Sequence, residues 1–229
     1  LLAHAASAAS ALCSTANRSP GGSGMRGNGF DNEGFDNEVA IIGTGFSGMA
    51  AAIALDRAGI EDFCLLEKAV DVGGTWRDNQ YPGACCDVPS HLYSFSYEPN
   101  PDWTRRFAPA REIHAYQRHV MHAYDLCDRC RGGFDVASAR WEDGGWTVTS
   151  RQGESLRARF LVSAVGALHL PHKPDLPGLE RFEGRVMHSA EWDAGYDWRG
   201  RRVVVVGKKE IVPIHELVGE VGDVSPEVL

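Results

Sequence analysis

Residues 39–48 read Val39-Ala40-Ile41-Ile42-Gly43-Thr44-Gly45-Phe46-Ser47-Gly48, and this stretch decides the fold. Its first four residues form a short apolar run that ends at glycine, which is typical of a strand buried in a parallel sheet. Residues 46–58 are rich in Ala, Ile, Leu and Met and stop at Gly59, which predicts a helix. Residues 62–66 form a second apolar run and predict another strand. Strand, helix and strand within about 30 residues indicate a βαβ unit with a right-handed crossover.

The glycines of this stretch, Gly43, Gly45 and Gly48, have the spacing G-x-G-x-x-G. The spacing alone is weak evidence, and its place between a strand and a helix gives it weight. In that context Gly43 permits the tight turn, Gly45 lets a pyrophosphate approach its backbone, and Gly48 lets the helix lie close to the strand. The N–H groups at the start of the helix then hold the phosphate oxygens.

Glu67 ends the second strand of the βαβ unit, 19 positions after Gly48. A carboxylate at this place accepts hydrogen bonds from the 2′- and 3′-hydroxyls of a dinucleotide's ribose. Its negative charge also repels a 2′-phosphate. We therefore predict that the site takes FAD or NAD and refuses NADP.

The rest of the chain predicts further α/β structure. Residues 69–110 form a long stretch crowded with Gly, Pro and aromatic residues, and a loop of that length is usually functional. Residues 111–124 are expected to be helical. Three strands are expected at residues 134–141, 146–150 and 156–165, with Gly144-Gly145 as the turn between the first two. A further buried strand is expected at residues 203–206, which are all valine.

The first 38 residues show neither a strand nor an amphipathic-helix period. Residues 1–24 are dominated by small residues and are interpreted as a disordered extension. Residues 29–38 repeat Gly-Phe-Asp-Asn-Glu in tandem. Because two copies cannot build a solenoid, this repeat is interpreted as an acidic linker.

Composition excludes several classes of protein. The 229 residues are enough for one large domain or two small ones. Hydrophobic residues at 43% and charged residues at 24% exclude a wholly disordered or fibrous chain. The net charge of −8 argues against binding to nucleic acid, because little would neutralise the phosphates. No run of 18 or more apolar residues occurs, so no membrane span is expected.

The six cysteines are too few and too irregularly spaced for a disulfide framework, and they favour reduced thiols in a cytoplasmic protein. They are Cys13, Cys64, Cys85, Cys86, Cys127 and Cys130. The last two form a C-x-x-C, which leaves open a functional dithiol or half of a zinc site. No second C-x-x-C or paired His follows at ligand spacing, and the histidines form no H-E-x-x-H, so no metal is expected.

Two later stretches carry a resemblance to a known family. The first is Gly73-Gly74-Thr75-Trp76-Arg77-Asp78-Asn79-Gln80-Tyr81-Pro82-Gly83, which runs on to Asp87. The second is the pattern Phe182-x-Gly184-x-x-x-His188-x-x-x-Trp192-Asp193. Together they resemble the signatures of the class B flavoprotein monooxygenases, especially the Baeyer–Villiger group, and the resemblance covers about residues 39–207.

The resemblance implies an α/β fold, with a Rossmann-like, three-layer FAD-binding domain that carries a small antiparallel β insertion. Residues 39–170 would be the N-terminal part of that domain. Residues 171–200 would be a linker carrying the monooxygenase fingerprint, and residues 201–229 the truncated start of an NADP-binding domain. The residues implied to bind FAD are Gly43, Gly45, Ser47, Gly48 and Glu67, with Thr75, Trp76, Asp87 and Tyr93 lining the flavin side and the backbone of Val136 meeting the adenine.

The resemblance also implies a reaction. In such enzymes NADPH reduces the flavin, O₂ adds to it, and a flavin C4a-peroxide delivers one oxygen to a ketone or to a soft nitrogen or sulfur centre. The expected partners are therefore a small-molecule substrate and O₂. The family's counterpart of Asp87 lies by the flavin and helps to place a catalytic arginine. His188 belongs to the linker between the two nucleotide domains, where it acts in domain movement.

The pattern of the family breaks after Val206. A second glycine fingerprint should follow there to hold NADPH, but Gly207 is followed by Lys208 and Lys209, and Pro213 would interrupt a helix. The chain is therefore expected to be an incomplete N-terminal part, a weak FAD binder that does not turn over alone.

Two other readings of the chain remain. A flavin disulfide reductase shares the opening βαβ unit, but it needs a C-x-x-x-x-C just after the second glycine pair. This chain has Trp76 there, and Cys85 and Cys86 are adjacent and too late. The other alternative is a non-catalytic FAD-binding relic or a misassigned gene product, which the unusual amino terminus and the break after Gly207 favour.

Overall fold

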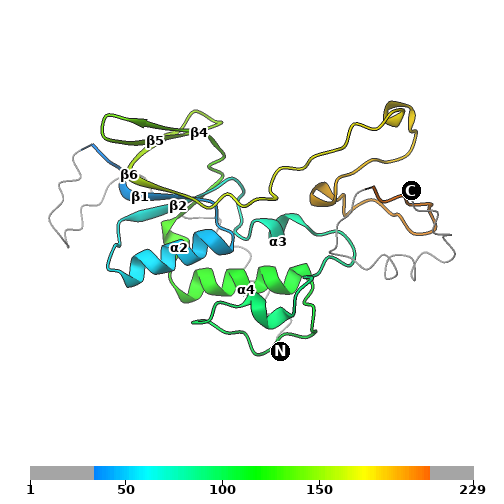
Figure 1. The fold of residues 1–229 in the computed structure, drawn as a ribbon, viewed down its shortest axis with the longest axis horizontal. Coiled ribbons are helices and arrows are strands. Elements are labelled where there is room, and N and C mark those ends of the chain that lie inside the picture. The colour runs from blue at the N-terminus through cyan, green and yellow to red at the C-terminus, as the bar shows by residue number, and fades with distance from the viewer. Residues whose placement is uncertain (1–33, 207–229) are drawn as a thin grey trace. The chain divides into compact units, whose positions relative to one another are not determined.

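The computed structural model describes residues 34–206, which include one mixed six-stranded sheet (Figure 1). The order across the sheet is β3-β2-β1-β6-β5-β4. The strands are β1 (Asn37–Ile42), β2 (Phe63–Glu67), β3 (Cys130–Gly132), β4 (Val136–Glu142), β5 (Gly145–Ser150) and β6 (Ser155–Ser163). The longer helices are α2 (Phe46–Arg57) and α4 (Ala110–Ala123), and α3 (Thr75–Asp78) is a single turn. The predicted α/β class is confirmed.

The predicted βαβ unit forms the centre of the sheet. β1 pairs in parallel with β2 on one side and with β6 on the other. α2 connects β1 to β2 and packs against both strands and β6. Side chains alternate across the strands, so one face of the sheet carries a buried cluster. Its members are Ala40, Cys64, Leu66, Phe134, Val148, Leu156 and Ala158.

The antiparallel part of the sheet is a meander, β4-β5-β6. β4 and β5 are joined by the two residues Asp143 and Gly144, which both have positive φ angles, of 49° and 76°. Two positive φ angles in a two-residue loop define the type I′ hairpin, for which Asp-Gly is a preferred sequence. The turn is therefore one residue earlier than predicted, and Gly145 is already the first residue of β5.

Order begins before the predicted residue Val39. β1 starts at Asn37, and the amide of Asp36 donates to the carbonyl of Arg157 at 2.9 Å. The ring of Phe35 covers Gly145, where an added Cβ would lie 2.1 Å from it. The acidic-linker interpretation is therefore wrong for residues 34–38, because one Phe and one Asp of the repeat bind the sheet. The first 33 residues lie outside the described part of the chain.

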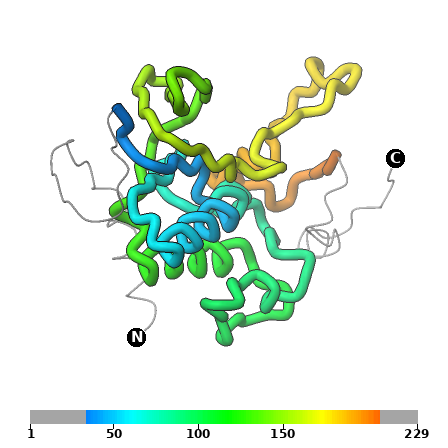
Figure 2. The backbone as a smooth tube through the Cα atoms, turned by 60° about the vertical axis from the view of Figure 1, so that its left-hand side comes forward, coloured from blue at the N-terminus to red at the C-terminus, as the bar shows by residue number. Residues whose placement is uncertain are grey.

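The segment after β6 also differs from the prediction. Residues 164–206 contain two short 3₁₀ helices, Leu179–Arg181 and Ser189–Glu191, and the tube in Figure 2 follows them, yellow to orange, along an irregular path. The predicted buried strand at 203–206 is wrong, since Val204 is 83% exposed and no described strand pairs with this segment. A strand needs a hydrogen-bonded neighbour, and an apolar run alone does not supply one. The predicted break at residues 207–213 lies outside the described residues.

Contacts within the chain divide it into two compact units. Among the described residues, the first unit comprises residues 34–74 and 117–167, and the second comprises residues 75–116 and 168–206. The first unit contains the whole sheet, and the second contains α3 and the loop-rich stretch. Between residues 34 and 206, no helix combines the length and the apolar character needed to cross a membrane.

Candidate functional site

The glycine turn between β1 and α2 is built as the spacing predicts. Gly43 has a φ of +102°, a conformation that L side chains rarely adopt. A Cβ added to Gly48 would lie only 2.0 Å from the carbonyl oxygen of Gly43. The helix therefore approaches the end of the strand so closely that a side chain at position 48 has no room.

The middle glycine of the turn faces open space. No heavy atom of the described residues lies within 4 Å of a Cβ added to Gly45, which is the N-cap of α2. Within residues 34–206 no side chain caps this helix, and no acidic residue occupies its first turn, where Ser47 is exposed. The first-turn amides of a helix have no acceptor within the helix, and they carry its partial positive charge. This end of α2 can therefore receive an anion.

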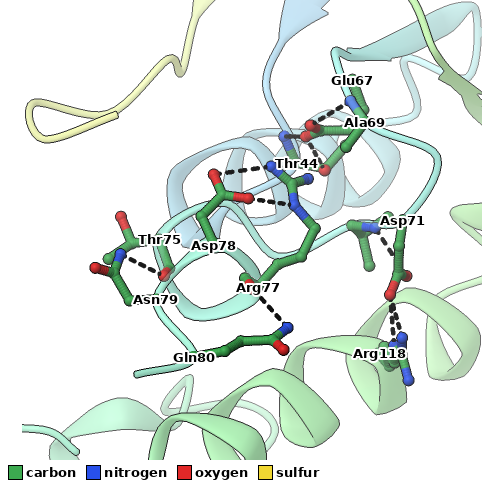
Figure 3. A network of polar contacts seen from close by, with 11 residues as sticks. Thr44, Glu67, Ala69, Asp71, Thr75, Arg77, Asp78, Asn79, Gln80 and Arg118 are labelled. Carbon is green, nitrogen blue, oxygen red and sulfur yellow. Dashed lines mark hydrogen bonds and ion pairs between the residues drawn. The ribbon is translucent and has the colours of Figure 1, made fainter. Parts of the chain in front are cut away.

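Glu67 lies beside the turn with its carboxylate directed toward it. The side chain is only 3% exposed. Its Oε2 accepts a hydrogen bond from the amide of Thr44 at 3.2 Å and another from the Thr44 hydroxyl, while Oε1 accepts from the amide of Ala69 at 3.0 Å (Figure 3). Three hydrogen bonds therefore hold this carboxylate in place next to the glycine turn.

Thr44 is a residue of the site that the glycine spacing does not reveal, because it occupies a variable position of the pattern. Besides bonding Glu67, its carbonyl accepts a hydrogen bond from the amide of Gly73 at 3.2 Å. A Cβ added to Gly74 would lie 3.5 Å from the Cα of Gly45. The second glycine pair therefore lies directly against the first glycine turn. This close approach explains why small residues occupy positions 73 and 74.

An ion pair that the sequence did not predict supports the loop after β2. Arg118 of α4 donates from Nε to Oδ2 of Asp71 at 3.0 Å, and a second guanidinium nitrogen contacts the same oxygen (Figure 3). The other carboxylate oxygen of Asp71 accepts from the amide of Val72 at 2.9 Å. These bonds hold the chain between Glu67 and the second glycine pair.

Val136 is the first residue of β4, and its side chain packs against the buried cluster of the sheet. Two residues earlier, the amide of Phe134 donates to the carbonyl of Glu67 at 2.9 Å. The backbone that enters β4 therefore passes beside the carboxylate that ends β2. The contact of Val136 with the adenine stays a prediction.

The second unit brings three of the four predicted flavin-side residues together. The ring of Trp76 meets Tyr93 edge to face, with centroids 5.1 Å apart. Burial raises the pKa of Tyr93, and the nearby charge of the exposed Asp87 raises it further. Thr75 begins α3, where its carbonyl accepts hydrogen bonds from the amide and the side chain of Asn79 (Figure 3).

The fingerprint segment is a set of local contacts. An added Cβ at Gly184 would lie 2.5 Å from the ring of Phe182, so the ring packs over the glycine two residues later. Nδ1 of His188 accepts a hydrogen bond from the amide of Ala190 at 3.1 Å and thereby caps the helix Ser189–Glu191. This short helix contacts α3 within the second unit.

Each unit thus gathers its own share of the predicted site. The first unit brings together the glycine turn, the acid and the strand that follows it, namely Gly43, Gly45, Ser47, Gly48, Glu67 and Val136. The second brings together Trp76, Asp87 and Tyr93, with Thr75 on the same helical turn as Trp76.

Comparison with known proteins supplies the context for this geometry. A family model described as pyridine nucleotide-disulphide oxidoreductase matches residues 40–211. A Baeyer-Villiger monooxygenase of Streptomyces coelicolor is 50% identical over 171 residues, which are 74% of this chain and 33% of that protein.

Two solved structures are similar as well. The open crystal structure of cyclohexanone monooxygenase is 38% identical with a TM-score of 0.68, and the match covers 76% of this chain and 35% of that one. The complex of OTEMO with FAD and NADP is 32% identical with a TM-score of 0.66, covering 73% of this chain and 33% of that one. The chain spans about a third of the length of the curated relatives that it matches.

Proposed function

This chain belongs to the pyridine nucleotide-disulphide oxidoreductase family, and we propose that it forms the FAD-binding part of a flavin-dependent monooxygenase of the Baeyer–Villiger type. Its relatives include proteins named Baeyer-Villiger monooxygenase that are 50% and 46% identical to it. The resemblance found in the two sequence signatures is therefore confirmed. The activity, substrates and partners of the whole protein are part of the proposal, because the chain matches only a third of those relatives.

The observation that carries the proposal is the open glycine turn with a buried acid beside it. The space on the Cβ side of Gly45 is clear of described atoms to 4 Å, and it lies at the N-terminus of a twelve-residue helix. Glu67 presents its carboxylate to the same turn through Thr44. A diphosphate fits the first feature and a ribose diol fits the second, so the residues present suit an adenine dinucleotide.

We assign the residues of this chain to parts of the cofactor as follows. Gly45 and the first-turn amides of α2 would hold the diphosphate, and Glu67 would accept hydrogen bonds from the ribose hydroxyls. The negative charge of Glu67 opposes a 2′-phosphate, which favours FAD over NADP at this turn. The flavin side would be lined by residues of the second unit, namely Thr75, Trp76, Asp87 and Tyr93.

FAD, when bound, would supply the activation of O₂ and the transfer of one oxygen atom to a ketone or to a soft nitrogen or sulfur centre. The protein would contribute binding, orientation and the exclusion of water. We propose that Asp87, exposed beside Tyr93, faces the flavin and helps to place an arginine. We propose that His188 acts through the linker, since its ring already organises the backbone there.

We assign the binding of NADPH and of the oxygenated substrate to the complete protein. We propose that residues 39–170 form the N-terminal part of the FAD domain, residues 171–200 the linker, and residues 201–229 the start of the NADP-binding domain. The solved relatives with NADP bound support this assignment, because they are about three times as long as the matched region.

A monooxygenase is favoured over a flavin disulfide reductase by the residues that follow the second glycine pair. A disulfide reductase places its reactive cysteines there, whereas this chain has the buried Trp76. Cys86, farther along, is buried, and its sulfur accepts a hydrogen bond from the amide of Ala108 at 3.1 Å. Such a thiol serves packing and not electron transfer.

The test is a titration of the purified chain with FAD, followed by the quenching of flavin fluorescence and by absorbance. The unmodified chain is expected to bind FAD and to prefer it to NADP⁺. Gly45→Val is expected to lose binding, because its methyl groups would occupy the space of the diphosphate while its backbone angles stay ordinary. Ala54→Val, on the exposed side of the same helix, is the matched control and should bind as the unmodified chain does.

Three outcomes would contradict the proposal. Flavin retention by Gly45→Val would move the site elsewhere. Preference for NADP⁺ would contradict the role of Glu67. Absence of any FAD binding by the unmodified, folded chain would contradict the claim that this part of the protein forms the site.

A further inference from the structure

The C-x-x-C of Cys127 and Cys130 lies outside every feature used for the flavin site. Both cysteines are partly exposed and belong to the first unit. Cys127 begins the 3₁₀ helix Cys127–Arg129, and Cys130 is the first residue of β3, which follows it. We propose that they form a redox-active dithiol, which small-molecule disulfides oxidise to an intramolecular Cys127–Cys130 disulfide with His122 as the base for Cys127. This inference does not depend on the proposed monooxygenase function.

The end of α4 creates the contact between the thiol and the imidazole. Asp125 adopts a positive φ of 52°, its amide donates to the carbonyl of His122 at 3.2 Å, and the amide of Leu126 donates to Met121 at 2.9 Å. These two bonds are those of a Schellman motif, which reverses the chain at the end of a helix. The reversal places Sγ of Cys127 at 3.6 Å from Nδ1 of His122.

The two cysteines are also placed for a disulfide. The amide of Cys130 donates to the carbonyl of Cys127, so the pair occupies the first and last positions of a hydrogen-bonded turn. The Cα atoms at those positions lie less than about 7 Å apart in such a turn. A disulfide spans Cα atoms about 4.4–6.8 Å apart, which overlaps that range. The turn can therefore close without unfolding β3.

The other described cysteines are placed differently. Cys64 is buried in β2, and burial raises its pKa to about 12. Cys86 is buried as well, and burial raises its pKa. Cys85 is followed directly by the buried Cys86. No second exposed thiol therefore lies at turn spacing from Cys85. Among the described cysteines, the pair at 127 and 130 alone combines exposure, turn spacing and a contact with the imidazole of His122.

Charged groups surround the pair without blocking it. Asp125 and Asp128 flank Cys127 in the sequence and are exposed. Arg129 pairs with Asp56 at 2.9 Å, and its guanidinium lies 4.6 Å from the centroid of the Phe63 ring. The arginine is thus held against α2 and β2, and His122 is the basic group in contact with the Cys127 sulfur.

The proposed reaction with glutathione disulfide is balanced in two exchanges. His122 accepts the thiol proton, and the Cys127 thiolate attacks one sulfur of glutathione disulfide, whose S–S bond breaks as a mixed disulfide forms and one glutathione leaves. The Cys130 thiolate then attacks the Cys127 sulfur and releases the second glutathione. Two cysteine thiols are oxidised, one glutathione disulfide is reduced to two thiols, and the two cysteine protons end on the leaving groups.

The experiment incubates the reduced, full chain with glutathione disulfide at neutral pH, alkylates the remaining thiols, and maps the cysteines by mass spectrometry after digestion. The expected product is a peptide pair joined through Cys127 and Cys130. Cys130→Ser should instead accumulate the glutathione mixed disulfide on Cys127, and Cys127→Ser should form neither product. Cys85→Ser is the matched control and should react as the unmodified chain does.

His122→Asn tests the role of the imidazole. Loss of the imidazole should slow the first exchange roughly threefold, because a smaller thiolate fraction is partly offset by greater nucleophilicity. Circular dichroism must show that each variant stays folded. Glutathionylation of Cys85 as fast as that of Cys127, or failure of Cys127 and Cys130 to join in the folded chain, would overturn the proposal.

Discussion

The two units hold their site residues by different means. In the first unit the sheet continues into the site through backbone hydrogen bonds, since the amide of Gly43 donates to Leu66 at 2.8 Å and the amide of Ala164 donates to Ile42 at 2.9 Å. In the second unit, backbone bonds such as that from the amide of Ser90 to the carbonyl of Arg106 at 2.7 Å are joined by bonds from side chains to the backbone. The hydroxyl of Ser90 donates to the carbonyls of Arg105 and Arg106, at 2.6 and 2.8 Å.

The difference predicts how each unit responds to substitution. The hydrogen bonds of a strand that is paired on both sides break cooperatively. A destabilising substitution near the glycine turn should therefore lower the stability of the whole first unit. A loop held in part by single side chains can open at one point, which is local unfolding at a lower free energy.

The largest effect is expected for Gly48→Ala. Its Cβ would lie 2.0 Å from the carbonyl oxygen of Gly43, which is backbone and cannot move aside without shifting α2. The free energy of unfolding should fall by about 3 kcal/mol, the upper part of the range for overpacking. Urea unfolding followed by circular dichroism measures it.

Gly45→Ala is the control for this substitution. It adds the same methyl group three residues earlier, at an ordinary φ of −75° and with no described atom within 4 Å. Its free energy of unfolding should change by less than about 0.5 kcal/mol. Equal losses in the two variants would mean that α2 does not rest on the strand end, and the contrast between the units would fail.

The next effect belongs to the second unit and concerns Tyr116→Phe. The phenol of Tyr116 donates to the carbonyl of Glu98 at 2.7 Å and accepts from the amide of Phe95 at 2.8 Å, and the residue is buried. Removing the oxygen removes both hydrogen bonds and should lower the free energy of unfolding by about 2 kcal/mol. Hydrogen exchange should show a faster Phe95 amide and unchanged amides in β1.

Tyr124→Phe is the matched control, because its hydroxyl makes a contact of 3.5 Å with Arg57 at the surface. It should leave exchange unchanged throughout. If Tyr116→Phe instead accelerates exchange in β1 as much as at Phe95, the second unit does not open by itself.

The same contrast explains how far the sequence could predict this molecule. The βαβ unit and the three antiparallel strands follow from apolar periodicity and glycine placement, because the sheet is specified by burial. The spacing also located Glu67 beside the turn. It did not reveal Thr44, since the hydroxyl and amide that bind Glu67 sit at a position that the glycine pattern leaves open.

The loop-rich segments were predicted less well, for physical reasons. The three-residue strand β3 is too short to show a period, and it forms because Leu65 offers a pairing edge to Cys130. Residues 203–206 have the composition of a strand but no described neighbour. Bonds such as that of Arg118 to Asp71 join residues 47 positions apart, and no local sequence pattern predicts them.

Gln117→Leu should stabilise the chain. Gln117 is fully buried on α4, and within residues 34–206 neither atom of its amide group meets a hydrogen-bond partner. Burying an unsatisfied amide is costly, so an apolar side chain of similar size should raise the free energy of unfolding by between about 1 and 2 kcal/mol. Urea unfolding measures the gain, and Gln152→Leu, at an exposed position, serves as the control. A loss of stability in Gln117→Leu would show that the amide has a partner in solution.

The smallest effect is a pH dependence that belongs to the first unit. Burial raises the pKa of the Cys64 thiol from 9.0 to about 12. Between these values the unfolded chain releases the proton while the folded chain keeps it, so stability is full below pH 9 and falls as the pH rises toward 12. The loss should reach about 1 kcal/mol near pH 10. Cys64→Ala should remove that part of the alkaline loss, whereas Cys127→Ala, at a partly exposed thiol, should not. Parallel alkaline losses in the unmodified chain and in Cys64→Ala would mean that water reaches the thiol in β2, and the first unit would then be less tightly packed than its sheet implies.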